Sequence, residues 1–207
     1  IQVVLSFDRP NLFWRVDHLR RPSDRPRALQ TALRNRPGAA IVYAPTRGYV
    51  EGLARRLSGW GLSAGLYHAG MRPVDRSRTL ERFLSGETRI VAATNAFGMG
   101  IDKPDVRTVI HFALPRSIEA FYQEAGRGGR DGRPALSIGM VHRSDRALQR
   151  RFARSGGDGG RQSRARRRQE LARLRAVWNY AASRTCRMRR ILRYFGESAA
   201  RSCGRCD

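Results

Sequence analysis

Short apolar runs alternate with amphipathic segments through the middle of the chain. The apolar runs lie at 39–44, 64–68, 89–93, 108–112 and 135–141. Each run is short for a helix, which favours buried strands. Between them, apolar residues recur three and four positions apart, as in helices packed on one face, over 46–59, 73–86 and 117–124. Strands that alternate with helices predict an α/β fold, with a parallel sheet and helices on both of its faces.

The two ends of the chain differ from this middle part. Residues 1–7 predict a strand or linker, Asp8–Asn11 a turn, and 27–35 a weakly amphipathic helix. After Val141 the apolar runs stop, and helical patterns follow, separated by a glycine-rich break at 155–160, over 143–154, 163–182 and 185–194. We therefore expect an α/β domain at 1–142 and a basic helical unit at 143–207.

The charge of the chain changes the picture more than its length does. The 207 residues include 41 basic and 17 acidic ones, which gives a formal net charge of +24. Lys103 is the only lysine, and the positive charge is densest after residue 143. A strongly basic protein attracts polyanions, of which nucleic acid is the commonest. A GC-rich gene would explain arginine in place of lysine, but not the shortage of acidic residues; a merely solvated basic surface is the alternative.

Composition also bounds the location of the protein. No run of about 18 apolar residues is present, so we expect no membrane span. Three cysteines suit a disulfide framework poorly and favour a reducing cytoplasm. The chain begins at Ile1, with neither a methionine nor a signal-peptide pattern, so we expect a piece of a longer protein.

Polar residues follow three of the predicted strands at the point where each strand ends. They are Thr46 and Arg47 after the first apolar run, His68 at the end of the second, and Thr94 and Asn95 after the third. Parallel strands place their carboxyl ends at one edge of a sheet, where ligands bind. Threonine hydroxyls, exposed N–H groups and an arginine suit the sugar-phosphate backbone of a single strand. For His68, a packed or capping role is an equal alternative.

Two arginines three positions apart, Arg127 and Arg130, lie among glycines directly after the helical segment at 117–124. Glycines let the backbone come close to a ligand and leave the guanidinium groups unobstructed. An arginine fork matches two phosphate oxygens at once. The pattern therefore predicts a phosphate-binding loop, with a surface turn that carries arginines as the alternative.

These stretches resemble the second RecA-like motor domain of superfamily 2 helicases, and in particular the RecQ DNA helicases. Phe7–Asn11 is similar to the linker into that domain, 96–104 to motif V, and 122–132 to motif VI. Cys186, Tyr194–Glu197 and Cys203–Asp207 resemble the zinc-binding subdomain of the family. The resemblance covers nearly the whole chain, and it implies a RecA-like fold followed by a small helical zinc-binding subdomain.

The resemblance also implies roles for single residues. Arg130 matches the arginine finger that reaches the γ-phosphate of ATP, Arg127 its supporting arginine, and Gln123 the glutamine of the same motif. Gly100 and Asp102 match motif V, which in the family connects the nucleotide cleft to the DNA. The strand-end residues named above fall where the family grips DNA phosphates.

Half of an ATPase site is absent from the sequence. There is no G-x-x-x-x-G-K-[ST] phosphate loop, and no Asp-Glu pair follows an apolar strand to hold Mg²⁺. In the family these belong to a first RecA-like domain, which we expect before Ile1. The implied function is ATP-dependent 3′-to-5′ unwinding of DNA in repair and recombination, on single strands and duplex junctions. We expect the chain alone to hydrolyse no ATP.

The cysteines predict a structural zinc site. Cys203 and Cys206 form a C-x₂-C pair, the usual chelating unit for zinc, and Cys186 lies early on a helix that lets the chain fold back toward them. The resemblance places a fourth cysteine just after Asp207, and His142 would be a poor substitute. Three ordinary reduced cysteines are the alternative.

Two other functions compete with the helicase interpretation. A non-enzymatic, basic zinc module that only binds nucleic acid would explain the missing phosphate loop, but it has no need of a glycine-set arginine finger. An RNA helicase or another superfamily 2 motor would share the motifs, but DEAD-box RNA helicases lack this cysteine tail.

Overall fold

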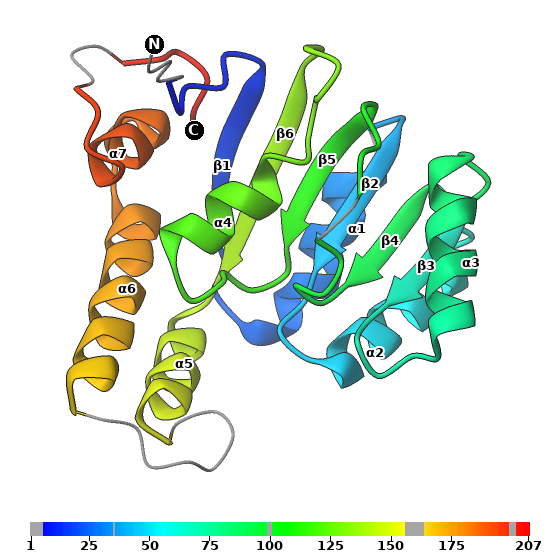
Figure 1. Ribbon diagram of the computed structural model, residues 1–207, viewed down its shortest axis with the longest axis horizontal. Coiled ribbons are helices and arrows are strands. Elements are labelled where there is room, and N and C mark those ends of the chain that lie inside the picture. The colour runs from blue at the N-terminus through cyan, green and yellow to red at the C-terminus, as the bar shows by residue number, and fades with distance from the viewer. Residues whose placement is uncertain (1–5, 35, 99–100, 156–163, 199–201) are drawn as a thin grey trace, which may run out of the picture.

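The computed structural model describes residues 6–34, 36–98, 101–155, 164–198 and 202–207 (Figure 1). Six strands form one sheet in the order β1-β6-β5-β2-β4-β3, and every pair is parallel. The strands are β1 (Leu12–His18), β2 (Ala39–Tyr43), β3 (Ala64–Tyr67), β4 (Ile90–Ala93), β5 (Val106–His111) and β6 (Ala135–Val141). Within the described residues, the predicted parallel α/β sheet is confirmed.

Helices cover both faces of the sheet, as predicted. They are η1 (Pro22–Asp24), α1 (Arg25–Arg34), α2 (Arg47–Gly59), α3 (Pro73–Leu84), α4 (Ile118–Ala125), α5 (Arg143–Ser155), α6 (Arg164–Ala182) and α7 (Arg187–Tyr194). Alternate residues of β2 separate the faces, because Val42 packs with α1 and α2 whereas Ile41 packs with Phe83 of α3. Figure 1 shows α1 and α4 on opposite sides of the sheet. No helix among the described ranges is long and apolar enough to cross a membrane.

The edge strand β1 was not predicted. The expected strand or linker at 1–7 lies largely outside the described residues, and the extended segment instead follows the turn, at Leu12–His18. Leu12, Trp14 and Val16 point inward, with exposed fractions of 0%, 1% and 5%, while the residues between them are more exposed. This alternation marks a strand with one buried face.

The C-terminal helices complete a hydrophobic cluster that β1 begins. Trp14 lies 5.7 Å from Phe121 of α4, and Phe121 lies 5.3 Å from Tyr180 of α6, measured between ring centroids. Met188 and Ile191 of α7 are also buried there. The α6–α7 segment and the sheet therefore share one apolar core. In Figure 1 both helices stand beside the β1 edge.

An ion pair between the buried Arg187 and the partly exposed Asp207 fixes the last residue of the chain to α7 and β1. The Arg187 Nε lies 2.6 Å from Asp207 Oδ1, and the Val16 N–H donates to Asp207 Oδ2 at 2.9 Å. Arg187 also donates to the Tyr180 and Ala181 carbonyl oxygens. Burial raises the pKa of the Asp207 carboxyl, but the hydrogen bonds from Arg187 and Val16 outweigh it and leave that pKa below its ordinary value.

We expect Arg187→Ala to lower the free energy of unfolding by about 3 kcal/mol, because one charge of a buried pair loses its partner. The value is at the low end for such pairs because the Asp207 side chain is 27% exposed. The contribution of the pair should be full above the ordinary aspartate pKa of about 3.9 and disappear as the pH falls through the lower folded value. Urea unfolding at several pH values tests this, with the exposed Arg190→Ala as control; equal losses for both variants would contradict it.

Candidate functional site

The three predicted strand-end segments meet at one edge of the sheet, because β2, β4 and β3 are neighbours. Thr46 caps α2, and its hydroxyl accepts from the Tyr49 N–H at 3.4 Å. The Arg47 guanidinium lies against Gly70, where a Cβ would come within 2.7 Å of Nη1, so only glycine lets it lie there. The Thr94 N–H donates to the Tyr67 carbonyl oxygen at 3.1 Å, which joins the residue after β4 to the last residue of β3.

The five predicted nucleic-acid residues differ in how they are presented. Thr46, Arg47 and Asn95 are exposed, and Thr94 is half-buried with its hydroxyl toward the Ala96 N–H. His68 is only 6% exposed, and its Nε2 lies 3.3 Å from the Glu51 carboxylate of α2. That burial favours the packed role for His68, in which the ring holds the loop after β3 against α2.

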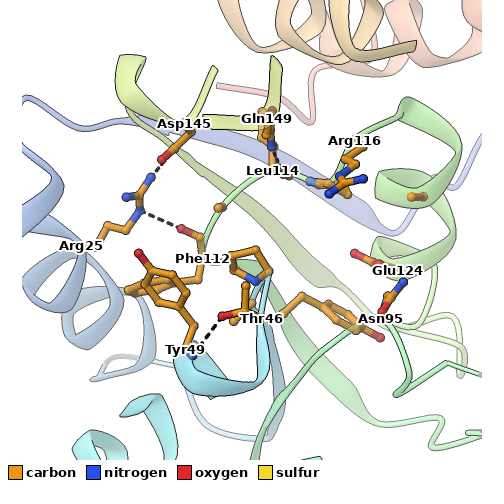
Figure 2. A pocket seen from close by; sticks show the side chains of 16 residues that line it. Arg25, Thr46, Tyr49, Asn95, Phe112, Leu114, Arg116, Glu124, Asp145 and Gln149 are labelled. Carbon is orange, nitrogen blue, oxygen red and sulfur yellow. Dashed lines mark hydrogen bonds and ion pairs between the residues drawn. The ribbon is translucent and has the colours of Figure 1, made fainter. Parts of the chain in front are cut away.

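A cavity of ≈ 550 Å³ opens beside this edge, between the start of α2, the β5–α4 connection and α5. Figure 2 shows Thr46 and Asn95 on its wall, together with Arg25, which donates to the Phe112 carbonyl oxygen and pairs with Asp145. Gln149 closes the α5 side by donating to the Leu114 carbonyl oxygen at 2.6 Å. Sequence reasoning missed these last residues, since Arg25 and Asp145 are 120 positions apart and carry no local signal.

Arg127 and Arg130 follow α4 and approach Gly98 and Ile101–Asp102, respectively. The Arg130 Nη1 lies 2.9 Å from Asp102 Oδ1 and donates to the Ile101 carbonyl oxygen at 3.2 Å. Both side chains of this pair reach solvent, with exposed fractions of 39% for Arg130 and 81% for Asp102. The finger candidate is therefore held loosely, by a partner at the surface.

Arg127 is held more deeply than Arg130. Its Nη2 lies 3.1 Å from the position that a Cβ would take at Gly98, and its Nε is buried without a hydrogen-bond partner. Burial raises the pKa of the neighbouring Tyr43, and the charge of Arg127 opposes that shift. Gln123 is exposed on α4, one turn before these arginines. Gly100 lies outside the described residues.

The three cysteines lie together. Their Sγ atoms are 3.3 Å (Cys186 to Cys203), 3.8 Å (Cys186 to Cys206) and 3.2 Å (Cys203 to Cys206) apart. Thiolates around a tetrahedral zinc, with Zn–S bonds of about 2.3 Å, lie about 3.8 Å apart, so the cluster fits that ion. Among the described residues, these three cysteines are the group of His, Cys, Asp or Glu side chains that lie close enough together to hold a metal ion.

The thiols of this cluster differ in acidity. Burial raises the pKa of the Cys186 thiol, but N–H donors from Arg189 and Cys203 outweigh it and lower the pKa to about 7. Burial and the neighbouring thiols raise the pKa of Cys206 to about 12. A cation would favour the thiolate at every position, because zinc binds deprotonated sulfur.

Comparison with known proteins places these sites in a family. Residues 24–132 match the helicase conserved C-terminal domain, and residues 143–207 match the RecQ zinc-binding family. Over 69% of this chain and 84% of the other, the fold matches the E. coli DEAD-box protein SrmB, solved bound to the regulator of ribonuclease activity A, with a TM-score of 0.58 and 28% identity.

Two relatives align over 98% of the chain. The ATP-dependent DNA helicase RecQ of Haemophilus influenzae is 38% identical, and the putative ATP-dependent RNA helicase R290 of Acanthamoeba polyphaga mimivirus is 37% identical. The chain spans only 32% and 36% of their respective lengths. The helicase domain match covers more than half of the chain, and the cysteine cluster lies in the RecQ-specific segment that follows. The chain therefore belongs to the RecQ helicase family, as a helicase C-terminal domain followed by a RecQ zinc-binding segment.

Proposed function

We propose that this chain is the second motor unit of an ATP-dependent DNA helicase that separates strands in the 3′-to-5′ direction during repair and recombination. The observation that carries the proposal is the position of residues 94–98. The Thr94 N–H donates to the carbonyl oxygen at the end of β3, and Gly98 packs against Arg127. One short segment thus runs from the strand-end surface, which includes Thr46, Arg47, Thr94 and Asn95, to the arginine loop at residues 126–133. Through such a segment, a movement of the arginine loop at the nucleotide site would alter how the strand-end surface binds single-stranded DNA.

The arginine loop would act at a nucleotide site shared with a first RecA-like domain of the same protein. That domain would supply the phosphate loop and the ligands of Mg²⁺. Arg130 would leave Asp102 and approach the γ-phosphate of ATP, while Gln123 on α4 and Arg127 just after it would support it. A guanidinium at that place stabilises charge that develops on the transferred phosphoryl group. The family match argues against a non-enzymatic zinc module, which would not need this loop.

The full-length protein tests the proposal directly. We expect it, with ATP and Mg²⁺, to separate a DNA duplex that carries a 3′ single-stranded overhang and to leave a duplex with a 5′ overhang intact. Strand release from a labelled duplex is the measurement. Absence of release from both substrates, or preference for the 5′ overhang, would contradict the proposal.

Binding of single-stranded DNA should weaken steeply with salt. With about four to six arginine–phosphate contacts, the slope of log K against log[salt] should be roughly −3 to −5, because each contact releases counterions. Arg47→Ala should reduce the slope by about 1, since it removes one cationic contact. Fluorescence anisotropy of a labelled oligonucleotide at several salt concentrations measures both quantities.

Thr46→Ala provides the matched control for Arg47. Thr46 is the adjacent exposed residue and carries no charge, so its loss should weaken binding without changing the slope. Affinity that barely depends on salt, or an equal change of slope for both variants, would contradict this assignment of the strand-end surface.

RNA is the second candidate substrate, because the mimivirus relative, at 37% identity, bears the name of a putative RNA helicase. The same unwinding assay with an RNA duplex separates the two. DNA is favoured by the match of residues 143–207 to the RecQ zinc-binding family. Faster release of RNA than of DNA would favour the second candidate.

A further inference from the structure

The arginine loop is held by the side chain of Arg9, which lies far from it in the sequence. The Arg9 guanidinium donates to three backbone carbonyl oxygens of the loop, those of Gly126 at 3.2 Å, Gly128 at 3.0 Å and Gly129 at 3.3 Å. The first of these directly precedes Arg127, and the other two lie between Arg127 and Arg130. One side chain therefore binds the backbone on both sides of Arg127.

Asn11 strengthens the same clamp. Its Nδ2 donates to the Gly129 carbonyl oxygen at 2.6 Å and to the Arg133 carbonyl oxygen at 2.9 Å. Gly129 has φ +58°, and a Cβ there would come within 2.5 Å of both Asn11 Nδ2 and the Arg133 carbonyl oxygen. The glycine is thus needed at this position for the loop to turn and for Asn11 to reach it.

The clamp belongs to a strap that is held at its other end by the C-terminal segment. Asp8 pairs with Arg205 at 2.9 Å, and Phe7 stacks on Phe195 with ring centroids 4.3 Å apart. The Tyr122 hydroxyl of α4 donates to the Phe7 carbonyl oxygen at 2.7 Å. Residues 6–11 therefore cannot shift freely, so the Arg9 guanidinium is a fixed point against which the loop is placed.

We propose that Arg9, supported by Asn11, is a positioning residue that sets the approach of Arg127 and Arg130 to the nucleotide. This inference rests on the proposed function of those two arginines. A finger contributes only when its guanidinium meets the transferring phosphoryl group, and a misplacement of about 1 Å costs on the order of 10²-fold in rate. The effect of Arg9 should therefore appear in turnover more than in ATP binding.

Steady-state ATPase assays of the full-length protein with saturating DNA test the inference. We expect Arg9→Ala to lower kcat about 10- to 100-fold and to change the KM for ATP by less than about 3-fold. Arg89→Ala is the matched control, because Arg89 also donates to three backbone carbonyl oxygens, those of Leu33, Arg36 and Gly38, and none of them belongs to the arginine loop. Thermal melting should show similar losses for the two variants, with kcat reduced only in Arg9→Ala.

The second test places Arg9→Ala in an Arg130→Ala background, where single-turnover rates remain measurable. If Arg9 acts through the finger, its loss should lower the rate there by a smaller factor than in the parent, because only its effect through Arg127 remains. Equal fold losses in both backgrounds, or equal kcat losses for Arg9→Ala and Arg89→Ala, would overturn the inference. If Arg9→Ala does not fold, Asn11→Ala takes its place under the same criteria.

The outcome for Arg130→Ala alone separates this inference from the proposed function. Near-normal turnover in Arg130→Ala would refute the finger itself, and the positioning role would fall with it. Strongly reduced turnover in Arg130→Ala together with a wild-type kcat in both Arg9→Ala and Asn11→Ala would overturn only the positioning role.

Discussion

Arg130→Ala in the full-length protein should lower kcat for DNA-stimulated ATP hydrolysis by about 10³- to 10⁵-fold while ATP binding changes little. An arginine finger acts on charge that develops in the transition state, so its loss raises the barrier without removing much ground-state affinity. The Arg130 side chain is 39% exposed, pairs with the more exposed Asp102 and donates to the Ile101 carbonyl oxygen. A pair at this exposure is weak, so releasing it to meet a phosphate costs little.

Arg133→Ala is the control for this prediction. Arg133 lies three residues further along the same glycine-rich segment, is also exposed, and contributes its backbone rather than its side chain to the loop contacts. We expect its kcat to stay within about 3-fold of the parent. Steady-state turnover together with equilibrium binding of a labelled ATP analogue separates the two effects. Near-normal hydrolysis in Arg130→Ala would contradict the finger assignment.

Arg127 should behave differently from Arg130. Its guanidinium packs over Gly98 and its Nε is buried, so it is part of the fixed wall of the loop as well as a phosphate ligand candidate. Removing it would alter the site in both the ground state and the transition state. The two arginines, three residues apart in the sequence, thus divide into an exposed group and a half-buried one.

The pattern of apolar runs was sufficient to predict five of the six described strands and the helices on both faces. Four of those strands are almost wholly buried and β3 is half-buried, and each is a short apolar run, so its signal is local. Strand β1 was missed because its signal is an alternation of burial, with Leu12, Trp14 and Val16 inward and the more exposed Phe13 and Arg15 between them, directly after a Pro-Asn turn. Attention to the period of two, rather than to continuous apolar runs, would have found it.

The strand-end surface could be predicted because topology alone brings it together. Carboxyl ends of adjacent parallel strands share an edge, and β3, β4 and β2 are adjacent. The clamp under the arginine loop could not be predicted in the same way. Arg9 and the carbonyl oxygen of Gly126 are 117 positions apart, and a backbone carbonyl leaves no trace in a sequence. The partner of His68 is the side chain of Glu51, which lies on another element, α2, and it too could be found only from the structure.

The spacing of Cys203 and Cys206 predicts a metal-binding pair, whereas the contacts that hold this pair in place could not be predicted from the sequence. The backbone of Arg205 pairs with Trp14, since the Trp14 N–H donates to the Arg205 carbonyl oxygen at 2.9 Å. The Asp207 N–H in turn donates to the Trp14 carbonyl oxygen at 3.1 Å. The cysteine loop is therefore built onto the edge of the sheet, beside the apolar cluster that β1, α4, α6 and α7 share.

Cys206→Ser in the full-length protein should reduce its zinc content from about one ion per chain to near zero. Loss of an outer partner of a metal ligand costs roughly 10- to 100-fold in affinity, and loss of a ligand itself should cost more. Structural zinc also supplies folding free energy, with apparent binding free energies of about 10–16 kcal/mol in small zinc peptides. The variant should therefore melt at a lower temperature. Helix α7 and residues 202–207 should open first, because they hold the three cysteines and are joined by the contact between Arg187 and Asp207.

Ser202→Ala is the matched control, since Ser202 is exposed and directly precedes Cys203. It should keep its zinc and its melting temperature. Metal content by mass spectrometry, melting with and without a chelator, and limited proteolysis after the arginines of α7 measure the three consequences. The zinc assignment is refuted if Cys206→Ser retains one zinc per chain, or if the parent protein holds no zinc and melts identically in chelator. Cleavage that begins in α3, on the opposite edge of the sheet, would instead show that the metal does not stabilise the segment that carries it.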